Sequence, residues 1–577
     1  MRAVHREVWL VTVVAAALGG GYLAAPRMGS DLAAQVARAE FFAAHGFTPI
    51  DLRWYGGVDQ LGYSLVSQPV MALLGVRVTG VLAMVLGSVL LVALLRRGGG
   101  ARLWAAGLLG VAGLAGNLVS GRVTYGLGVC LGLGALLALT FLPRRAAAAA
   151  AVILAALASA TSPVVALFLG LAGAALLLTG ALVPRSTRTA QPHGSGWLSG
   201  VLQARRSTPD DQPRGPGWRS EVPSTPRDTS ERRPGSGPGA GGTASGGRGL
   251  LVAVPAAAVI GVNAQFLSDG GWMNISRDDT VHAVVTGLVV ALLVPARPIR
   301  IGALLSSVGV LAAASIHTPV GLNATRLAVM FALPVLIAYA RMPALPRQTR
   351  TVALVAIVAL TAWWQPPVVS ADLRDRGNPT ADAGYFRPLT ALLGTLPLTG
   401  RVEIPPTRDY WEAAHLGDVP LARGWLRQAD IDRNPLFFTT VPGASGTGVA
   451  LTADSYRSWL GEQAVQYVAV PDAELAWPGR AEAELVTAGL PYLVIVAVLP
   501  HWHLYAVADP QPIVTAPATL VRHTAAAITL DDPDAGDVRV RIRWHPRLTV
   551  SGSARVIRDG RWTILRVPVP GRYTLSS

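Results

Sequence analysis

The sequence contains no lysine, one cysteine and few charged residues, and these shortages exclude several kinds of protein. The single cysteine, Cys130, excludes an intramolecular disulfide and a metal site built from several cysteines. Only 14% of the residues are charged, whereas 51% are hydrophobic and the mean hydropathy is +0.42. A soluble protein of 577 residues carries more charge than this. We therefore expect a membrane protein with several spans and some soluble portions.

The charge that is present is strongly basic. The formal net charge is +15, and because lysine is absent, all of the basic charge comes from arginine. On a soluble protein this would indicate a nucleic-acid partner. Here the arginines lie in short loops between apolar runs and in one low-complexity insert, so we expect no nucleic acid. The sequence also lacks a P-loop, a GxSxG elbow, an HExxH motif and a GxGxxG motif in a strand-turn-helix context, which argues against a soluble, nucleotide-driven mechanism.

Apolar runs of the length that crosses a bilayer alternate with short polar loops. A helix needs about 20 apolar residues to cross the hydrocarbon core. The sequence predicts about eleven such spans. They are expected at residues 8–25, 72–95, 103–118, 123–142, 146–161, 163–183, 249–267, 281–296, 301–316, 327–341 and 351–365.

The arginines between these spans indicate how the chain is oriented. Alternate loops carry few of them, namely Arg122, Arg277 and Arg326, whereas the other loops carry clusters. We therefore expect a multi-pass protein of the cell membrane with its amino terminus in the cytoplasm. The loop 26–68 and everything after residue 365 are expected outside. The clusters assigned to the cytoplasmic side are Arg2 and Arg6; Arg96, Arg97 and Arg102; Arg144 and Arg145; Arg297 and Arg300; and Arg341, Arg347 and Arg350.

Composition divides the chain into five segments. One of them, residues 186–248, is rich in Pro, Gly, Ser and Arg and cannot bury enough apolar surface to offset its ordering entropy. It is therefore predicted to be a disordered cytoplasmic linker. An alternative for it is contact between arginines and anionic lipid head groups. The predicted fold class is mainly α: a polytopic transmembrane helical bundle, followed by an extracytoplasmic α/β domain and a small C-terminal β module. The segments are 1–185 (transmembrane helices 1–6 with the loop 26–68), 186–248 (linker), 249–366 (transmembrane helices 7–11), 367–510 (α/β domain) and 511–577 (β module).

The polar loop 26–68 holds the main catalytic candidate, Asp31. This residue comes shortly after the first span, so its carboxylate is expected at the outer membrane surface. There it could act as a general base towards an acceptor hydroxyl, or hold a divalent cation, Mg²⁺ or Mn²⁺, against a phosphate. No resident metal site is predicted. The alternative role is that of a helix cap, because Ser30 and Asp31 precede an apolar-periodic run and both residue types are favoured at caps.

Four further residues of the loop belong to the predicted site. Asp51 is the second catalytic candidate, and Asp59, Trp54 and Tyr55 are candidates for substrate binding. Aromatic faces beside carboxylates suit sugar rings. Trp and Tyr also anchor proteins at membrane interfaces, and this alternative is kept for Trp54 and Tyr55.

Arginines on the outward side are the candidates for binding a phosphate, because the guanidinium fork matches phosphate oxygens. Arg326 is preferred, since it lies at the outer mouth of a span with His317 nearby; the alternative is a salt bridge to a loop aspartate. Arg122 is a weaker candidate of the same kind, and Arg277 completes the predicted substrate-binding set. In the soluble part, residues 400–438 are dense in Arg, Trp, Asp and Glu. They predict either a carbohydrate cleft or the polar seam that docks this domain on the bundle.

This arrangement resembles the GT-C class of integral membrane glycosyltransferases, which carry an acidic residue in an early outward loop and often an outward soluble domain at the carboxyl end. The resemblance rests on Asp31 in MGSDLAAQVARAEFFAAHG and on the stretches DLRWYGG, GYSLVSQP, GRVTYGLG and ATSPVVALFLGLA. The chain is also similar to multi-span membrane proteins of actinobacteria, through GRVEIPPTRDYWEAAH and HWHLY.

The resemblance implies transfer of a sugar from a polyprenyl-phosphate donor to an extracytoplasmic acceptor, which is a glycan or lipid of the cell envelope or a protein. It implies Asp31 as the base and Arg326 as the ligand of the donor phosphate. Two other functions stay open at this point. One is a multi-span transporter, for which Asn263 and Gln265 are the notable polar residues at mid-membrane. The other is a non-catalytic membrane protein that binds envelope polymers.

Overall fold

The computed structural model describes residues 2–182, 242–267, 270–342 and 346–577. Most of the segment predicted to be a disordered linker lies outside the described residues. Its last part does not, because helix α9 begins at Gly242. The linker prediction is therefore wrong for residues 242–248, which belong to a helix.

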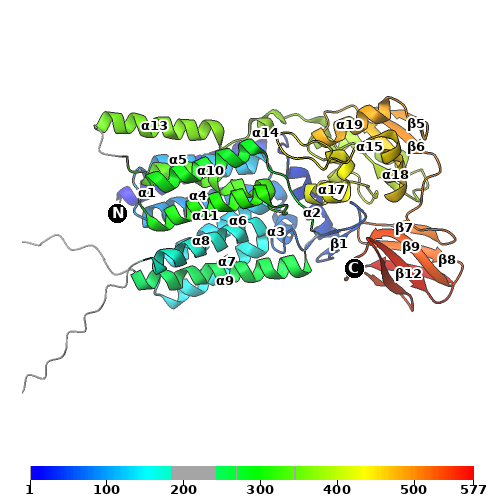
Figure 1. The fold of residues 1–577 in the computed structure, drawn as a ribbon, viewed down its shortest axis with the longest axis horizontal. Helices are drawn as coiled ribbons and strands as arrows, with labels where there is room; N and C mark the ends of the chain where they lie inside the picture. Colours follow the sequence, from blue (N-terminus) through cyan, green and yellow to red (C-terminus); the bar gives the residue numbers. More distant parts are fainter. Residues whose placement is uncertain (1, 183–241, 268–269, 343–345) are drawn as a thin grey trace, which may run out of the picture.

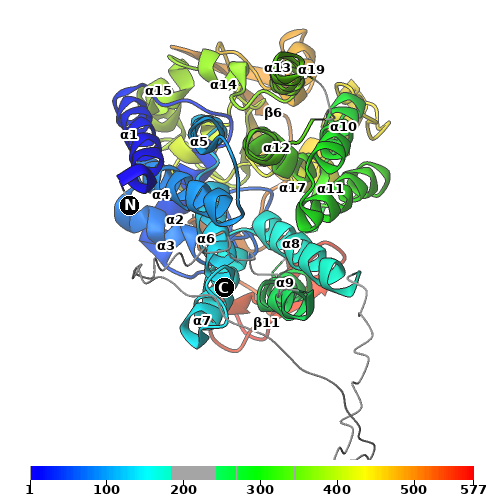
Figure 2. The same cartoon turned by 90° about the vertical axis from the view of Figure 1, so that its left-hand side faces the viewer.

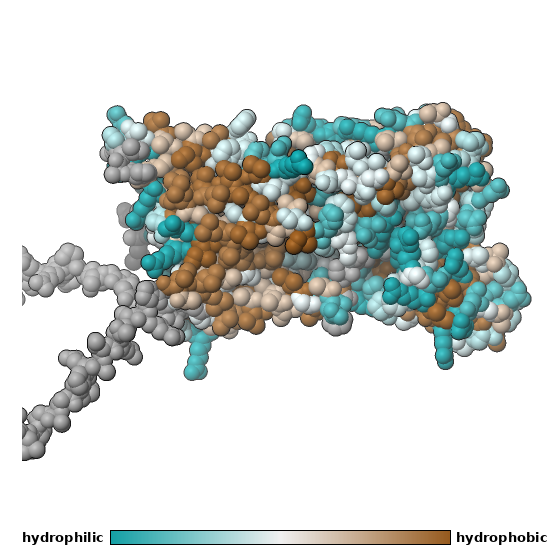
Figure 3. Space-filling view, in the orientation of Figure 1, coloured by the Kyte–Doolittle hydropathy of each residue, from teal (hydrophilic) through white to brown (hydrophobic). Residues whose placement is uncertain are grey.

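Long apolar helices lie side by side and form a bundle (Figure 1). Among the described residues, six helices are long and apolar enough to cross a membrane, and three apolar helices are shorter. Figure 3 shows the bundle as a broad hydrophobic region, while the other end of the molecule is mostly hydrophilic. The bundle contains α1 (Arg2–Ala24), α4 (Val76–Arg97), α5 (Leu103–Val119), α6 (Val123–Leu139), α7 (Arg145–Thr161), α8 (Pro163–Ala181), α9 (Gly242–Phe266), α10 (Arg277–Leu293), α11 (Arg297–Ser315), α12 (Arg326–Tyr339) and α13 (Arg347–Trp364).

Glycines let some of these helices pack closely. A β-carbon on Gly107 of α5 would lie 2.6 Å from a methyl group of Val11 in α1. A β-carbon on Gly173 of α8 would lie 2.8 Å from the carbonyl oxygen of Gly249 in α9. Small residues at such crossings bring helix backbones together, which is how helices associate in lipid.

The loop 26–68 and the soluble residues that follow α13 lie at the same end of the bundle, opposite the amino terminus (Figure 1). Figure 2, viewed from the amino-terminal end, shows the helices grouped around α6, α8 and α12. The side of the membrane on which each end lies stays a prediction. The loop contains α2 (Leu32–His45), β1 (Ile50–Asp51) and β2 (Val58–Asp59), and α3 (Ser67–Leu74) follows it.

The first soluble unit is an α/β domain with one four-stranded sheet. The strand order is β3-β4-β6-β5, in which β3 runs parallel to β4 and the other pairs are antiparallel. Its strands are β3 (Arg401–Glu403), β4 (Val465–Pro471), β5 (Leu493–Leu499) and β6 (Trp502–Val507), and its helices are α14 (Ser370–Arg374), η2 (Pro379–Ala381), α15 (Ala383–Leu393), α16 (Glu412–His415), α17 (Arg427–Arg433), η3 (Pro435–Phe438), α18 (Ala453–Glu462) and α19 (Trp477–Thr487).

The second soluble unit is a β module made of two antiparallel sheets, in the orders β10-β13-β8-β7 and β11-β12-β9. Residues alternate along β9, so that Val538 and Val540 are buried while Arg539 faces outward. Ile50 and Leu52 of the early loop lie in the same apolar core, which ties the module to that loop. The strands are β7 (Thr519–His523), β8 (Ala527–Asp532), β9 (Gly536–Arg543), β10 (Thr549–Val550), β11 (Arg555–Asp559), β12 (Trp562–Val567) and β13 (Gly571–Ser576).

The coarse fold class is confirmed: the protein is mostly helical, with several apolar helices and a β-rich C-terminal region.

The predicted orientation can be tested by cysteine labelling, since the native Cys130 is buried. Ser553→Cys in the β module and Ala101→Cys at the opposite end of the bundle both replace exposed residues. We expect a membrane-impermeant maleimide to label Ser553→Cys on intact cells, and to label Ala101→Cys only after the cells are permeabilised. The reverse pattern would show that the orientation is inverted.

Candidate functional site

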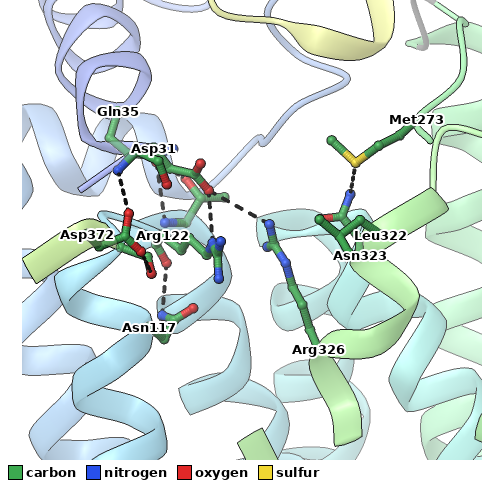
Figure 4. Close-up of polar contacts among 12 residues, drawn as sticks. Asp31, Gln35, Asn117, Arg122, Met273, Leu322, Asn323, Arg326 and Asp372 are labelled. Atoms are coloured by element: carbon green, nitrogen blue, oxygen red, sulfur yellow. Dashed lines mark hydrogen bonds and ion pairs between the residues drawn. The ribbon is translucent and has the colours of Figure 1, made fainter. Parts of the chain in front are cut away.

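Asp31 occupies the position before helix α2, but it does not cap that helix. Its backbone angles are φ −107° and ψ −4°, and its side chain accepts no hydrogen bond from the first turn. The carboxylate points instead to two arginines (Figure 4), with Oδ2 lying 3.2 Å from Nε of Arg122 and 3.8 Å from Nη2 of Arg326. The alternative role of Asp31 as a helix cap is therefore wrong. The salt bridge expected as the alternative for Arg326 is present, and its partner is Asp31 itself.

The turn between α5 and α6 brings Arg122 to Asp31. Gly121 in this turn has φ +74°, and a β-carbon there would lie 2.5 Å from the backbone nitrogen of Leu32. Glycine therefore lets the start of α2 pack directly on the turn. The backbone N–H of Asp31 also donates to the carbonyl oxygen of Ser120, over 3.0 Å.

Arg326 approaches the same carboxylate from another part of the bundle. It is the first residue of α12 and follows the short helix η1 (Gly321–Thr325). Its guanidinium carbon lies 4.9 Å from the centre of the Tyr125 ring, so an aromatic face supports the cation. The side chains of Asp31, Arg122 and Arg326 are 19%, 27% and 22% exposed. All three are therefore accessible to solvent or to a ligand.

These three side chains, here called the ion cluster, carry a net charge of +1. Two guanidinium groups held near one carboxylate leave one positive charge unbalanced, and this charge attracts a second anion. Arg326 is the better placed of the two to bind that anion, because its contact with Asp31 is the longer one. Its N–H fork matches phosphate and carboxylate oxygens.

A polar and aromatic surface lies beside the ion cluster. Gln35, one turn along α2, donates from Nε2 to the hydroxyl of Tyr63 over 2.7 Å and accepts from Oγ1 of Thr124 over 2.6 Å. The Tyr63 ring packs edge-on against Trp425 of the α/β domain, with 6.2 Å between the ring centres. Burial raises the pKa of Tyr63, so its hydroxyl stays protonated at neutral pH.

Two carboxylates of the α/β domain hold the backbone in front of Asp31. Asp375 accepts from the N–H of Gly29 over 3.1 Å, and Asp372 accepts from the N–H of Ser30 over 3.2 Å. The second oxygen of Asp372 accepts from the hydroxyl of Ser120 over 2.5 Å, as Figure 4 outlines. We call Asp372 and Asp375 the backbone clamp. Because both are buried, the soluble domain fixes where Asp31 begins its helix.

A third carboxyl group, that of Asp409, lies beside Asp375 of the backbone clamp. Burial, and then the hydrogen bond and charge of Asp375, raise the pKa of Asp409 to about 8. Asp409 is therefore protonated at neutral pH and can share its proton with Asp375. Asn378 bridges the two groups, with Nδ2 at 2.9 Å from Asp375 and at 3.3 Å from Asp409.

Asp51, the second predicted catalytic residue, lies away from the ion cluster. Its carboxylate is fully buried and accepts three hydrogen bonds from the side chain of Arg53 at 2.7–3.1 Å and one from Gln60 at 3.0 Å. This is the geometry of a structural ion pair. Removing one partner of such a pair costs about 3–5 kcal/mol. Substitution of Asp51 would therefore test folding rather than catalysis.

Trp54 and Tyr55 are buried between the early loop and the α/β domain. Their exposed fractions are 0% and 1%, and the hydroxyl of Tyr55 donates to the carbonyl oxygen of Gly424. This burial corrects both expectations for the pair, since neither ring can contact a sugar or the membrane interface. The sequence could not distinguish burial from sugar binding or from anchoring at the membrane interface. An aromatic pair in a polar loop has the same local pattern in each of these three situations.

Asp59 joins the early loop to the β module. Its Oδ2 lies 3.1 Å from Nη1 of Arg547 and 3.4 Å from Nε2 of His545, and Oδ1 accepts from the N–H of Gly62 over 2.8 Å. The carboxylate is buried. This corrects the expectation that Asp59 binds substrate, because its oxygens are engaged within the protein.

His317 and Arg277 lie at the same end of the bundle but belong to a different contact region. His317 stacks on Trp272, with 4.3 Å between the ring centres, and the backbone N–H of Arg277 donates to Gly443 over 3.1 Å. Both side chains are exposed. The structure does not bring them into contact with Asp31, and their role in substrate binding stays a prediction.

The charged stretch 400–438 is mainly an internal network of the α/β domain. Arg423 lies 2.9 Å from Asp430, 2.9 Å from Glu482 and 3.6 Å from Glu403, and all four side chains are buried. Burial raises the pKa of Glu482 to about 7. This buried network is neither a cleft nor a docking seam.

Other residues of the stretch do contact the early loop: Arg433 donates from Nη1 to the carbonyl oxygen of Gly57 over 2.8 Å, and the backbone N–H of Leu421 donates to the carbonyl oxygen of Arg53 over 2.7 Å. Trp425 makes a further contact of this kind, because its Nε1 donates to the carbonyl oxygen of Ser30 over 3.1 Å.

The donor atoms at the site do not fit a divalent cation. Asp31 is the only carboxylate of the ion cluster, and two guanidinium groups already occupy its surroundings. In the part of the chain that the structure describes, no group of three or more His, Cys, Asp or Glu side chains is placed to hold a metal ion. The mechanism below uses no Mg²⁺ or Mn²⁺.

Comparison with known proteins gives matches among solved structures. No protein-family model matches the chain, and no curated protein matches it. The chain is similar to a structure of the arabinofuranosyltransferase AftD from Mycobacteria, with 17% identity, a TM-score of 0.45, and coverage of 92% of this chain and 41% of that one. The chain is also similar to a structure of a mutant AftD, with 13% identity and a TM-score of 0.43. This match covers 99% of this chain and 60% of that one. The chain thus spans less than two thirds of the proteins it matches. By its name, AftD is an enzyme that transfers arabinofuranosyl groups.

The proton shared in the clamp predicts a pH-dependent contribution to stability. The pKa of Asp409 is raised in the folded state from 3.8 to about 8, so the folded protein binds this proton more tightly than the unfolded chain does. The contribution of this proton to the free energy of unfolding is complete below about pH 4 and is lost as the pH rises to about 8. The free energy of unfolding falls by no more than about 1.4 kcal/mol per pH unit over this range. Asp409→Asn keeps a hydrogen-bond donor but cannot titrate.

Thermal unfolding between about pH 5 and pH 9 checks this prediction. We expect the melting temperature of wild type to fall more steeply than that of Asp409→Asn up to about pH 8, and the two curves to run parallel above it. Asp534→Asn, at an exposed position of the β module, is the control and should follow wild type. Equal slopes for wild type and Asp409→Asn would refute the shared proton.

Proposed function

We propose that this chain is a membrane glycosyltransferase that moves a sugar from a polyprenyl-phosphate donor to an acceptor of the cell envelope, outside the membrane. The observation that carries the proposal is the ion cluster at the end of the bundle. There, one accessible carboxylate lies beside two arginines that together carry an unbalanced positive charge. A lipid donor can reach this position while its chain stays in the bilayer.

In this mechanism Arg326 binds the donor phosphate. Its contact with Asp31 measures 3.8 Å, so exchanging that contact for a phosphate oxygen costs little. Arg122, at 3.2 Å, keeps the carboxylate in place. The same two guanidinium groups would stabilise the phosphate charge that develops when the sugar–phosphate bond breaks.

Asp31 acts as the general base. An acceptor hydroxyl attacks the anomeric carbon of the donor sugar, its proton passes to the Asp31 carboxylate, and polyprenyl phosphate leaves with the electron pair of the broken bond. The backbone clamp supports this role, because it fixes the residues that immediately precede the base.

Tyr63 and Trp425 are the aromatic groups proposed to bind the acceptor. They lie next to the ion cluster and come from the early loop and from the α/β domain, respectively. This assignment replaces the buried pair Trp54 and Tyr55. A surface formed jointly by the two parts would place an acceptor from outside the membrane over the base.

The transport hypothesis has less support. Asn263, which was expected at mid-membrane, donates from Nδ2 to the carbonyl oxygen of Gly62 over 2.8 Å. It therefore lies at the end of the bundle that carries the early loop, and not at a central binding site of the kind that transporters use.

Substitution of the base is the first test of this function. We expect Asp31→Asn to lower sugar transfer by about 10²- to 10⁴-fold, the range for loss of a general base. Asparagine is also favoured before a helix, so the fold should persist. The assay uses purified protein in lipid nanodiscs with labelled polyprenyl-phosphate donors of several sugars, arabinofuranose among them, and Asp534→Asn as the control. Transfer by Asp31→Asn at the wild-type rate would rule out Asp31 as the base.

Substitution of Arg326 tests the phosphate contact separately. Arg326→Lys keeps the charge but loses the paired N–H groups, so the KM for the donor should rise by about 10- to 100-fold, with a smaller change in kcat. Kinetics at varied donor concentration measure this split. A fall in kcat at an unchanged donor KM would mean that Arg326 acts elsewhere in the reaction.

A further inference from the structure

Two arginines with unpartnered N–H groups lie where the early loop, the α/β domain and the β module meet. Arg401 in β3 is 1% exposed, and its guanidinium donates to the backbone carbonyl oxygens of Gln463, over 2.6 Å, and of Arg541. Arg543 in β9 places its guanidinium carbon 4.9 Å from the centre of the Trp562 ring. Among the described residues, Nε of Arg401 and both Nε and Nη2 of Arg543 are buried without a hydrogen-bond partner.

Gly56 of the early loop links these two arginines. Its carbonyl oxygen accepts from the backbone N–H of Arg543 over 2.7 Å. A β-carbon on Gly56 would lie 3.0 Å from Nη2 of Arg401 and 3.4 Å from the Trp562 ring. Both guanidinium groups therefore border one small region, here called the arginine junction, to which all three parts of the chain contribute.

The arginine junction has more positive than negative charge. In the part of the chain that the structure describes, no carboxylate forms an ion pair with Arg401 or Arg543. The carboxylate that acts on Arg543 from a distance is that of Glu462. It is 40% exposed and already pairs with Arg561 over 3.0 Å. The charges of Arg401 and Arg543 are therefore left without a counter-charge in the protein.

Burial and neighbouring charges make both cations unfavourable where they lie. Burial, and then the charge of Arg541, lowers the pKa of Arg401 to about 9. Burial also lowers the pKa of Arg543 to about 9, and neighbouring arginines add to this shift, namely Arg433, Arg561 and Arg401. Both guanidinium groups still carry their proton at neutral pH. A buried charge without a partner is costly, so a bound anion would stabilise the junction.

The unpartnered groups indicate the chemistry of that ligand. Gln463 is 2% exposed, and its Nε2 also has no partner among the described residues. The side-chain nitrogens of arginine and glutamine donate hydrogen bonds and accept none. A ligand that satisfies them must offer acceptors, and the surplus positive charge favours a negative one. The burial of Arg401 and Gln463 limits the ligand to a small ion.

We propose that the arginine junction is an anion-binding site for a small oxyanion of the phosphate or sulfate type, held by Arg401, Arg543 and the side-chain amide of Gln463. The oxygens of such an ion match the N–H groups of a guanidinium. The ion joins the early loop to both soluble units, because each of these parts contributes to the junction. The site uses none of the residues of the ion cluster, so it does not rest on the proposed function.

Thermal unfolding of the full chain in dodecyl maltoside, with inorganic phosphate as the probe, tests the proposal. All proteins carry Arg326→Gln, so that the ion cluster has no surplus charge to attract the phosphate. Phosphate is added up to about 10 mM while sodium chloride keeps the ionic strength constant, because salt exclusion acts only at higher concentration. We expect a saturable rise in melting temperature of about 2–5 °C, as for an ion that binds the folded state alone.

Two arginine variants locate the bound phosphate. Arg543→Gln should lose at least half of the phosphate-dependent rise. Arg555→Gln, at an exposed arginine of the same β module, is the matched control and should keep all of it. A background protein that responds to phosphate no more than to chloride would overturn the proposal. An equal response of Arg543→Gln and Arg555→Gln would overturn it as well.

A carboxylate supplied by the chain itself gives a second test, which holds even if Arg543→Gln does not fold. Gln463→Glu replaces the unpartnered Nε2 with a negative oxygen of nearly the same size. We expect its melting temperature without phosphate to rise and its response to phosphate to disappear.

Gln68→Glu is the matched control for this change. Gln68 is also 2% exposed, but its Nε2 donates to the carbonyl oxygen of Gln60 over 2.8 Å. The new carboxylate would lose this hydrogen bond and repel the carbonyl oxygen, so the melting temperature should fall. A fall for Gln463→Glu as large as that for Gln68→Glu would show that the junction does not attract an anion, and the proposal would be wrong.

Discussion

The contact between Asp31 and two arginines is the interaction on which the rest of the site depends. The three residues come from the starts of three helices, α2, α6 and α12, which are far apart in sequence. Their partial exposure keeps the charges reachable, while their shared contact holds them in one place. In the proposed mechanism the cluster combines a proton acceptor, Asp31, with an anion-binding group, Arg326, the two functions that a transfer from a phosphate donor needs.

The position of this cluster depends on the soluble part of the chain as much as on the bundle. The backbone clamp reaches across 342 residues of sequence from Asp372 to Ser30, and 346 from Asp375 to Gly29. The β module is attached through Asp59, and Trp54 and Tyr55 fill the space between the early loop and the α/β domain. Three of the residues first expected to bind substrate, Trp54, Tyr55 and Asp59, thus belong to the scaffold that supports Asp31.

The sequence was sufficient for the coarse architecture, and it named three residues that the structure brings together, Asp31, Arg122 and Arg326, whose roles stay predictions. Apolar runs predicted the helical bundle, and positions at the ends of spans singled out Asp31 and Arg326. The burial of Asp51 could not be foreseen, although Arg53 two residues later offered a local partner. The roles of Asp372, Asp375 and Trp425 could not be foreseen either. Their partners lie hundreds of residues away, and only the assembled fold brings them together.

The same reason explains why the aromatic residues were misassigned. Trp54 and Tyr63 lie nine positions apart in one loop, yet one is buried in the interior and the other lies beside the ion cluster. Composition marks the loop as polar and aromatic, but packing against the α/β domain decides which ring stays accessible.

The account is tested most directly by a structure of the protein with a polyprenyl-phosphate sugar donor bound. The account predicts the donor phosphate within hydrogen-bond distance of the Arg326 guanidinium, with the anomeric carbon next to the Asp31 carboxylate. A phosphate bound at Arg277 and His317, away from Asp31, would contradict it.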